Sequence, residues 1–188
     1  MSSPRASSRR RTLIALGAVA VVQALAVLAY LHVERSRQQP ADGAFAFERL
    51  TGAPPLPAIA FTRADGTWLQ SSKLRGRPVL LHFWATWCAP CRQELPSLLQ
   101  LARSEPNLRV VALSLDSDWP VVRAFFSGAV PPEVFRDPSQ TLIGSYGVNA
   151  LPDSFLITGS GTAVLRFRGA RVWHGEAARA ELAPYLLP

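Results

Sequence analysis

Two cysteines are the residues of this sequence with the clearest chemical potential. Cys88 and Cys91 are the only cysteines among the 188 residues, and Ala89 and Pro90 separate them. Because no cysteine is left for a structural framework, the pair indicates redox chemistry or metal binding. Two cysteines at this spacing can close a small disulfide ring. Pro90 suits the first turn of a helix, where its missing N–H costs little.

The segments around the two cysteines predict a strand followed by a helix. The apolar run Val79–Ala85 is typical of a strand that is covered on both faces. From Pro90 to about Arg103, apolar residues recur at helical spacing. Cys88 would then lie at the N-terminus of the helix, where the helix dipole and unpaired N–H groups lower the pKa of its thiol. We expect the Cys88 thiolate to attack a substrate disulfide and Cys91 to release the reduced substrate.

The remaining pattern predicts one α/β domain over residues 58–188. In chain order it has strands at Ala58–Thr62, Trp68–Leu69, Val79–Ala85 and Leu108–Leu115, a helix from Asp118 to about Phe126, a short helix after Asp137, a hairpin of Ser154–Thr158 and Thr162–Arg168, and a last helix at Glu176–Leu187. A βαβ unit followed by an antiparallel hairpin gives a mixed central sheet flanked by helices.

The N-terminal part of the chain predicts a membrane anchor. The 20 residues 12–31 are almost entirely apolar, and as a helix they would be about 30 Å long, the thickness of a bilayer's hydrocarbon core. Arginines before this stretch favour a cytoplasmic N-terminus. We therefore expect a basic cytoplasmic segment at 1–11, a transmembrane helix at 12–31 and a proline-containing tether at 32–57. A cleavable signal peptide is the alternative interpretation of the apolar stretch.

The net charge of +7 does not predict nucleic-acid binding. Residues 1–50 hold seven basic and three acidic groups, whereas residues 51–188 hold 13 basic and 10 acidic groups. The excess beside the apolar stretch is a topology signal, and no basic stripe of the kind that nucleic acids require follows it.

Two segments resemble the thioredoxin superfamily, and most of all the membrane-anchored TlpA/ResA-like reductases of bacteria. The first is Phe83–Cys91, followed by Glu94 and Pro96. The second is Tyr146–Ile157, which is similar to the family segment that carries a cis-proline. The resemblance runs from about Leu56 to the C-terminus and implies a thioredoxin-like fold.

The resemblance also implies roles for individual residues. Pro152 would be cis and face the disulfide, and the backbone of Leu151 would pair with an extended substrate peptide. Trp87, Ala89 and Pro90 would belong to the substrate-facing surface around Cys88. No metal and no cofactor beyond the redox-active disulfide is expected.

Glu94 and His82 each have two interpretations. Glu94 could tune the pKa of the thiols or relay a proton, or it could be a solvated helix carboxylate. His82 occupies the place where thioredoxin itself has a buried acid, and it is either a proton relay or a packed polar residue.

The expected function is reduction of disulfides in exported proteins, with the catalytic domain on the periplasmic side of a bacterial inner membrane. The family implies apocytochrome c as one substrate class. A membrane-embedded electron donor is expected, because the reduced state must be regenerated in an oxidising compartment. The alternatives are a disulfide-forming oxidase and a copper-binding chaperone. A peroxidase fits poorly, because Thr86 lies two residues before Cys88, whereas the peroxiredoxin pattern has its threonine three before.

Overall fold

The computed structural model describes residues 17, 21–30, 45–52 and 55–186 in two compact units, Met1–Asp42 and Gly43–Pro188. In the first unit, residues 21–30 are helical and exposed. Among the described residues, no helix combines the length and the apolar character needed to cross a bilayer. The predicted cytoplasmic segment 1–11 lies outside the described residues, as does much of the predicted anchor 12–31.

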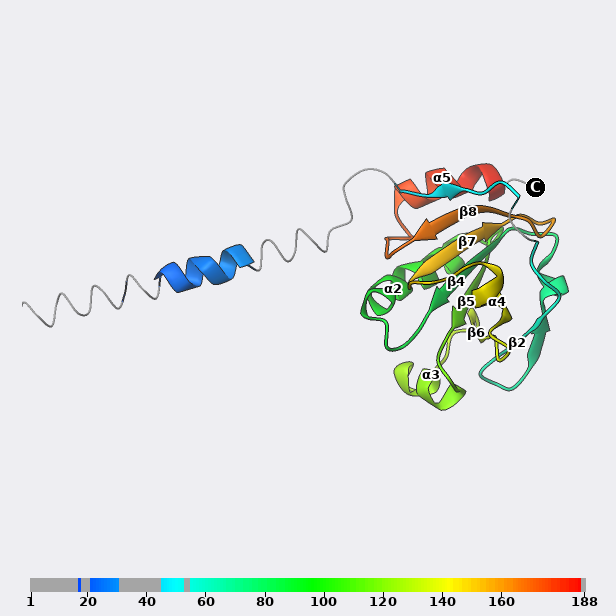
Figure 1. Cartoon of the computed structure of the whole chain (residues 1–188), viewed down its shortest axis with the longest axis horizontal. Helices are drawn as coiled ribbons and strands as arrows, with labels where there is room; N and C mark the ends of the chain where they lie inside the picture. The colour runs from blue at the N-terminus through cyan, green and yellow to red at the C-terminus, as the bar shows by residue number, and fades with distance from the viewer. Residues whose placement is uncertain (1–16, 18–20, 31–44, 53–54, 187–188) are drawn as a thin grey trace, which may run out of the picture. The chain divides into compact units, whose positions relative to one another are not determined.

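The second unit is built on a mixed sheet, to which the described residues contribute eight strands (Figure 1). Their order is β1-β8-β7-β4-β5-β6-β2-β3. Their bounds are β1 Glu48–Arg49, β2 Ala60–Thr62, β3 Trp68–Gln70, β4 Val79–Trp84, β5 Arg109–Ser114, β6 Val134–Arg136, β7 Asp153–Ile157 and β8 Ala163–Arg168. β4 pairs in parallel with β5 and antiparallel with β7, which confirms the predicted mixed sheet.

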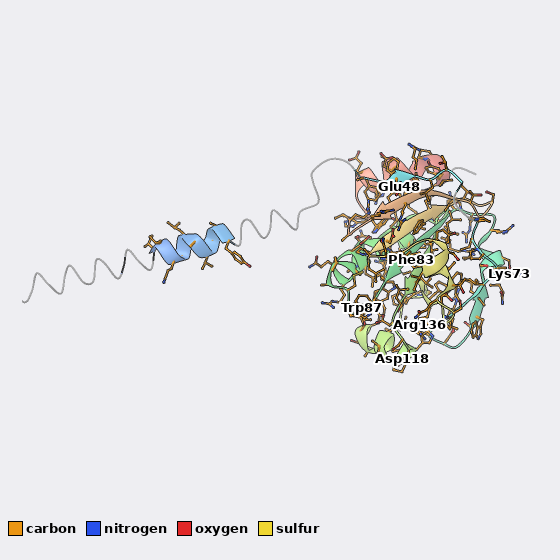
Figure 2. The ribbon with its side chains drawn as sticks, in the orientation of Figure 1. Glu48, Lys73, Phe83, Trp87, Asp118 and Arg136 are labelled. Carbon is orange, nitrogen blue, oxygen red and sulfur yellow. A yellow bond between two sulfur atoms is a disulfide. The ribbon has the colours of Figure 1, made fainter. Side chains whose placement is uncertain are left out.

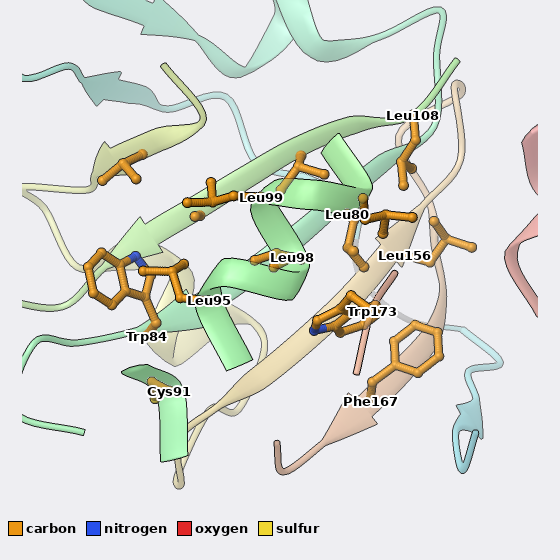
Figure 3. Packing of buried hydrophobic residues seen from close by; sticks show 14 of the residues in the cluster. Leu80, Trp84, Cys91, Leu95, Leu98, Leu99, Leu108, Leu156, Phe167 and Trp173 are labelled. Carbon is orange, nitrogen blue, oxygen red and sulfur yellow. The ribbon is translucent and has the colours of Figure 1, made fainter. Parts of the chain in front are cut away.

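Helices cover both faces of this sheet. They are the 3-10 helix η1 Ser71–Leu74 and the α-helices α2 Ala89–Ser104, α3 Trp119–Phe125, α4 Thr141–Ser145 and α5 Glu176–Leu186. The side chains of Leu80 and Trp84 on β4 pack in one buried cluster with Leu95 and Leu98 of α2 (Figure 3). Alternate residues of β4 join a second cluster with Leu142 of α4. Because successive side chains of a strand point to opposite faces, one central strand supports both layers.

β4 positions the cysteine motif. All six of its residues are buried, as the apolar run predicts. The strand ends at Trp84 and α2 begins at Ala89, so the motif lies in a tight connection at the carboxyl end of a central parallel strand. Ligands and reacting groups bind at this edge of parallel α/β sheets.

The predicted tether is too long at its C-terminal side, because several of its residues belong to the domain. Glu48 and Arg49 form β1 and pair with β8. Arg49 also donates a hydrogen bond from Nη1 to the Tyr185 hydroxyl of α5 at 3.1 Å. Phe45 and Phe47 pack against the α2-side cluster. Phe45 and Phe47 stand at alternate positions, a pattern that suits an edge strand with one buried face. The prolines that follow predicted a tether, but they do not prevent this segment from pairing with the sheet.

Candidate active site

Cys88 and Cys91 form a disulfide, with their Cα atoms 5.3 Å apart. Cys88 is the N-cap of α2, and its Sγ accepts a hydrogen bond from the backbone N–H of Cys91 at 3.2 Å. This placement confirms the predicted position at a helix N-terminus. Cys88 is 6% exposed and Cys91 is fully buried. A substrate can therefore approach Cys88, while Cys91 is shielded behind it.

Asp116 holds the loop that precedes Cys88. Its Oδ2 accepts hydrogen bonds from the backbone N–H of Thr86 at 3.0 Å and from the Ser114 hydroxyl at 2.7 Å. Its Oδ1 accepts a third bond from the Thr86 hydroxyl at 2.6 Å. Asp116 is not among the site residues predicted from the sequence. The available signal was an acidic residue just beyond β5, because the carboxyl ends of adjacent parallel strands meet at one edge of a sheet.

An apolar groove lies beside the disulfide. Its volume is about 490 Å³, and it is lined by Trp87, Cys88, Pro90, Leu115, Val148, Asn149, Ala150 and Leu151. Trp87, labelled in Figure 2, is 67% exposed. The Leu151–Pro152 peptide bond is cis, as the resemblance implied. The structure thus brings Trp87, Pro90 and Leu151 together around Cys88, whereas Ala89 and Pro152 adjoin this set without lining the groove.

Glu94 is buried, which excludes the solvated helix carboxylate. It is 3% exposed and lies three residues after Cys91 on the buried face of α2. Its Oε1 accepts a hydrogen bond from Nε1 of Trp173, and its Oε2 has no partner among the described residues. Burial raises the pKa of Glu94 from 4.5 to about 8, although Trp173 and Arg171 act in the opposite direction. A carboxyl group with this pKa can exchange a proton near neutral pH.

His82 is a buried neutral side chain on β4. Its Nδ1 lies 2.8 Å from the Ser154 hydroxyl, and its Nε2 has no partner within the described part of the chain. Burial lowers the pKa of His82 to about 3, and the positive charge of Arg171 adds to this effect. The described hydrogen bonds connect His82 to neither cysteine nor to Glu94, so its role as a proton relay stays a prediction.

The copper-binding alternative would use the same two cysteine sulfurs. Both cysteine sulfurs are joined in the disulfide, and a metal requires the thiolate. No group of three or more His, Cys, Asp or Glu side chains within the described ranges is placed to hold an ion.

Two kinds of comparison with known proteins agree with this geometry. Residues 53–165 match the model of the AhpC/TSA family. The thiol–disulfide oxidoreductase ResA of Bacillus anthracis is 34% identical over 126 residues, which cover 65% of this chain and 72% of ResA. The thiol:disulfide interchange protein DsbE of Escherichia coli is 32% identical over 162 residues, which cover 81% of this chain and 85% of DsbE.

A solved structure has the same fold. The crystal structure of a protein described as a thiol:disulfide interchange protein DsbE, from Chlorobium tepidum, superposes with a TM-score of 0.64 at 32% identity. The superposition covers 73% of this chain and 99% of that protein. The chain therefore belongs to the AhpC/TSA family of thioredoxin-like proteins, and it is a thiol–disulfide oxidoreductase of the ResA/DsbE type.

Proposed function

We propose that this oxidoreductase acts as a reductase, which transfers two electrons from the Cys88–Cys91 dithiol to disulfides of exported proteins. The observation that carries the direction is the buried carboxyl group of Glu94, one helical turn after Cys91. Burial raises the pKa of Glu94 to about 8, and the same buried environment disfavours the negative charge of a thiolate on Cys91, which is fully buried as well. Oxidases of this superfamily do the opposite, because they stabilise the reduced form. An environment that disfavours the thiolate favours the disulfide, which makes the dithiol a stronger reductant.

The reaction proceeds through a mixed disulfide. The Cys88 thiolate attacks one sulfur of the substrate disulfide, the substrate S–S bond breaks, and the other substrate sulfur leaves as a thiolate that takes a proton. Cys91 then passes its proton to the Glu94 carboxylate and attacks Cys88. This step forms the Cys88–Cys91 disulfide and expels the second substrate thiolate, which is protonated in turn. Two electrons have then moved from the enzyme to the substrate. One of the two protons that the substrate gains is the Cys91 proton, which Glu94 passes on, and the other comes from the solvent, which took up the Cys88 proton when its thiolate formed.

The groove beside Cys88 indicates the form of the substrate. Its lining is mostly apolar, and none of its side chains is charged. The backbone of Leu151 borders it, so an extended peptide can pair there as an added strand. We propose that substrates present a disulfide in an unfolded segment with apolar neighbours. Apocytochrome c, with paired cysteines in an unfolded chain, is one member of this class.

The proposed location is the periplasmic side of the bacterial inner membrane. The support is in the sequence: a basic segment at 1–11 and an apolar stretch at 12–31. In this compartment a membrane-embedded donor would return electrons to the disulfide. Labelling of mildly reduced intact spheroplasts with a membrane-impermeant maleimide tests the location. We expect Cys88 to be labelled without permeabilisation, and labelling only after lysis would contradict the proposal.

The reduction potential tests the proposed direction. The full-length chain is equilibrated with dithiothreitol buffers and followed by tryptophan fluorescence, because Trp84 and Trp87 precede the disulfide closely. We expect a potential near or below about −270 mV, the value of thioredoxin. A value near −120 mV would instead make the protein an oxidase. A Cys91→Ser variant, which cannot form the disulfide, is the control and should show no transition.

A further inference from the structure

Arg171 lies in an aromatic cage next to the active-site helix. Its guanidinium carbon is 5.0 Å from the ring centroid of Phe45, 5.1 Å from that of Phe167 and 5.6 Å from that of Trp173. The three rings also contact one another: Phe45 and Phe167 each lie 5.2 to 5.4 Å from their neighbours in the cage. Figure 3 shows Trp173 and Phe167 next to one another in the buried cluster. A cation at these distances from several ring faces is strongly attracted.

The N-terminal segment of the domain completes this cage. Nη1 of Arg171 donates a hydrogen bond to the carbonyl oxygen of Ala46 at 2.7 Å, and Nη2 donates to that of Arg168 at 2.8 Å. Phe45 supplies one ring of the cage. The position of Arg171 therefore depends on residues 45–46, which are far from it in the sequence and lie within the predicted tether 32–57.

Trp173 connects the cage to Glu94. Its indole N–H donates to Oε1 of Glu94, and its backbone N–H donates to the Ser97 hydroxyl at 3.1 Å. That hydroxyl donates in turn to the carbonyl oxygen of Glu94 at 2.8 Å. Trp173 thus fixes both the side chain of Glu94 and the turn of α2 that carries it.

Arg171 also acts on Glu94 directly. Its positive charge and its backbone N–H both favour the charged carboxylate. Nε of Arg171 and Oε2 of Glu94 are, in addition, a buried donor and a buried acceptor that lack partners among the described residues. The other ionisable groups nearby do not replace this interaction: His82 is neutral, and Asp153 is paired with Arg166 at 2.5 Å.

We propose that Arg171 is a positioning residue of the disulfide site, which is held in place by residues 45–46 and which orients Glu94 beside Cys91 through Trp173. The inference deepens the proposed function, since it rests on Glu94 exchanging a proton with Cys91. When Glu94 gives up its proton, Arg171 stabilises the carboxylate that is left. The start of the domain thereby contributes to proton transfer at the active site without touching the substrate.

The titration of Glu94 tests this role in the full-length, detergent-solubilised, oxidised protein. Trp173 donates to Glu94, so tryptophan fluorescence should change when Glu94 loses its proton. The step in the curve of fluorescence against pH that disappears in the Glu94→Gln variant belongs to Glu94. In Arg171→Gln we expect that step to move upward by about one pH unit, because a nearby cation no longer favours the carboxylate. Phe45→Ala, which opens the cage, should move it in the same direction.

Three comparisons make the test decisive. Arg179→Gln removes an equal charge from an exposed pair with Glu105 and should leave the step unchanged. Arg171→Lys, which keeps the charge, should reverse part of the shift. The pH at which dithiothreitol reduces the disulfide at half its maximal rate should move with the fluorescence step.

The outcomes separate this inference from the proposed function. The inference is overturned if no step depends on Glu94, or if Arg171→Gln and Phe45→Ala titrate like the wild type. If Arg171→Gln does not fold, Phe45→Ala decides alone. A wild-type chain that fails to reduce protein disulfides refutes the proposed reductase activity, whereas the titration still tests the action of Arg171 on Glu94.

Discussion

Replacing Glu94 by glutamine should stabilise the oxidised protein at pH 8 and have little effect at pH 4.5. Glutamine is nearly isosteric with the protonated acid, and its Oε1 can accept the hydrogen bond from Trp173 that Glu94 accepts now. In the unfolded chain the carboxyl group ionises near its ordinary pKa of 4.5, whereas burial in the fold raises that pKa to about 8. Between these values the folded protein binds one more proton than the unfolded chain, so its stability falls as the pH rises.

The magnitude follows from the two pKa values. Each pH unit in this window reduces the free energy of unfolding of the wild type by about 1.4 kcal/mol. From pH 4.5 to about 8, the loss has an upper bound of about 5 kcal/mol. The Glu94→Gln variant lacks this loss, so the difference between its free energy of unfolding and that of the wild type should grow steadily with pH. His82 affects both proteins equally and cancels in the difference.

Urea unfolding of both proteins at intervals from pH 5 to pH 8 measures this difference. Glu105→Gln is the matched control, because Glu105 lies at the C-terminal end of the same helix but is partly exposed. We expect the Glu105 variant to follow the wild type within about 1 kcal/mol at every pH, as an exposed charge pair contributes little. Parallel curves for wild type and Glu94→Gln would refute the reasoning, since they would show that the buried carboxyl group does not retain its proton.

Three further predictions concern the cysteines, His82 and the loop before Cys88. Cys88→Ser should abolish disulfide reduction, whereas Cys91→Ser should accumulate mixed disulfides that non-reducing gels resolve; multiple turnovers by either variant would contradict the two-step mechanism. His82→Gln should resist acid better than the wild type. The unfolded wild-type chain binds a proton on His82 below about pH 6.5, whereas the folded protein binds it only near pH 3, so the free energy of unfolding falls by several kcal/mol at most as the pH falls through this range. Unfolding curves at pH 4 and pH 7 test this prediction, and an equal loss of stability in the wild type and in His82→Gln would refute it. Asp116→Ala should destabilise the fold by about 2 to 4 kcal/mol, since it removes the acceptor of three hydrogen bonds, two of them from Thr86. If the variant has the unfolding midpoint of the wild type and its disulfide is reduced by dithiothreitol at the wild-type rate, the loop does not need Asp116.

The sequence predicted the parts of the fold that have a strong local pattern. The apolar run of β4, the helical spacing of α2 and the start of α3 beside Asp118 all lie where they were expected. Asp118 is the N-cap of α3, and its side chain accepts a hydrogen bond from the backbone N–H of Val121 at 3.2 Å. β6 was missed, because three residues after Pro131 and Pro132 are too few to show an alternation. β1 was missed because a two-residue strand becomes regular only when β8 lies beside it.

The residues of the site fall into the same two groups: some have a recognisable local pattern in the sequence, and others are brought together only by the fold. The cysteines and Pro152 are adjacent to recognisable motifs, so sequence alone located them. Trp173 and Arg171 reach Glu94 from a loop almost 80 residues away, and no spacing in the sequence reports such a contact. The burial of Glu94 is also a tertiary property. A glutamate three residues after Cys91 has the same local pattern whether it faces water or Trp173.

β1 has a practical consequence for where this chain can be cut. It covers β8, and an exposed salt bridge of 3.3 Å between Glu48 and Arg168 adds to the pairing. A chain shortened to the predicted boundary at Ala58 would leave the six residues of β8 as an open sheet edge, with Phe167 no longer covered by Phe45. Unprotected edges of this kind recruit other strands and promote aggregation. A shortened chain for crystallisation or assay should therefore begin ahead of Phe45.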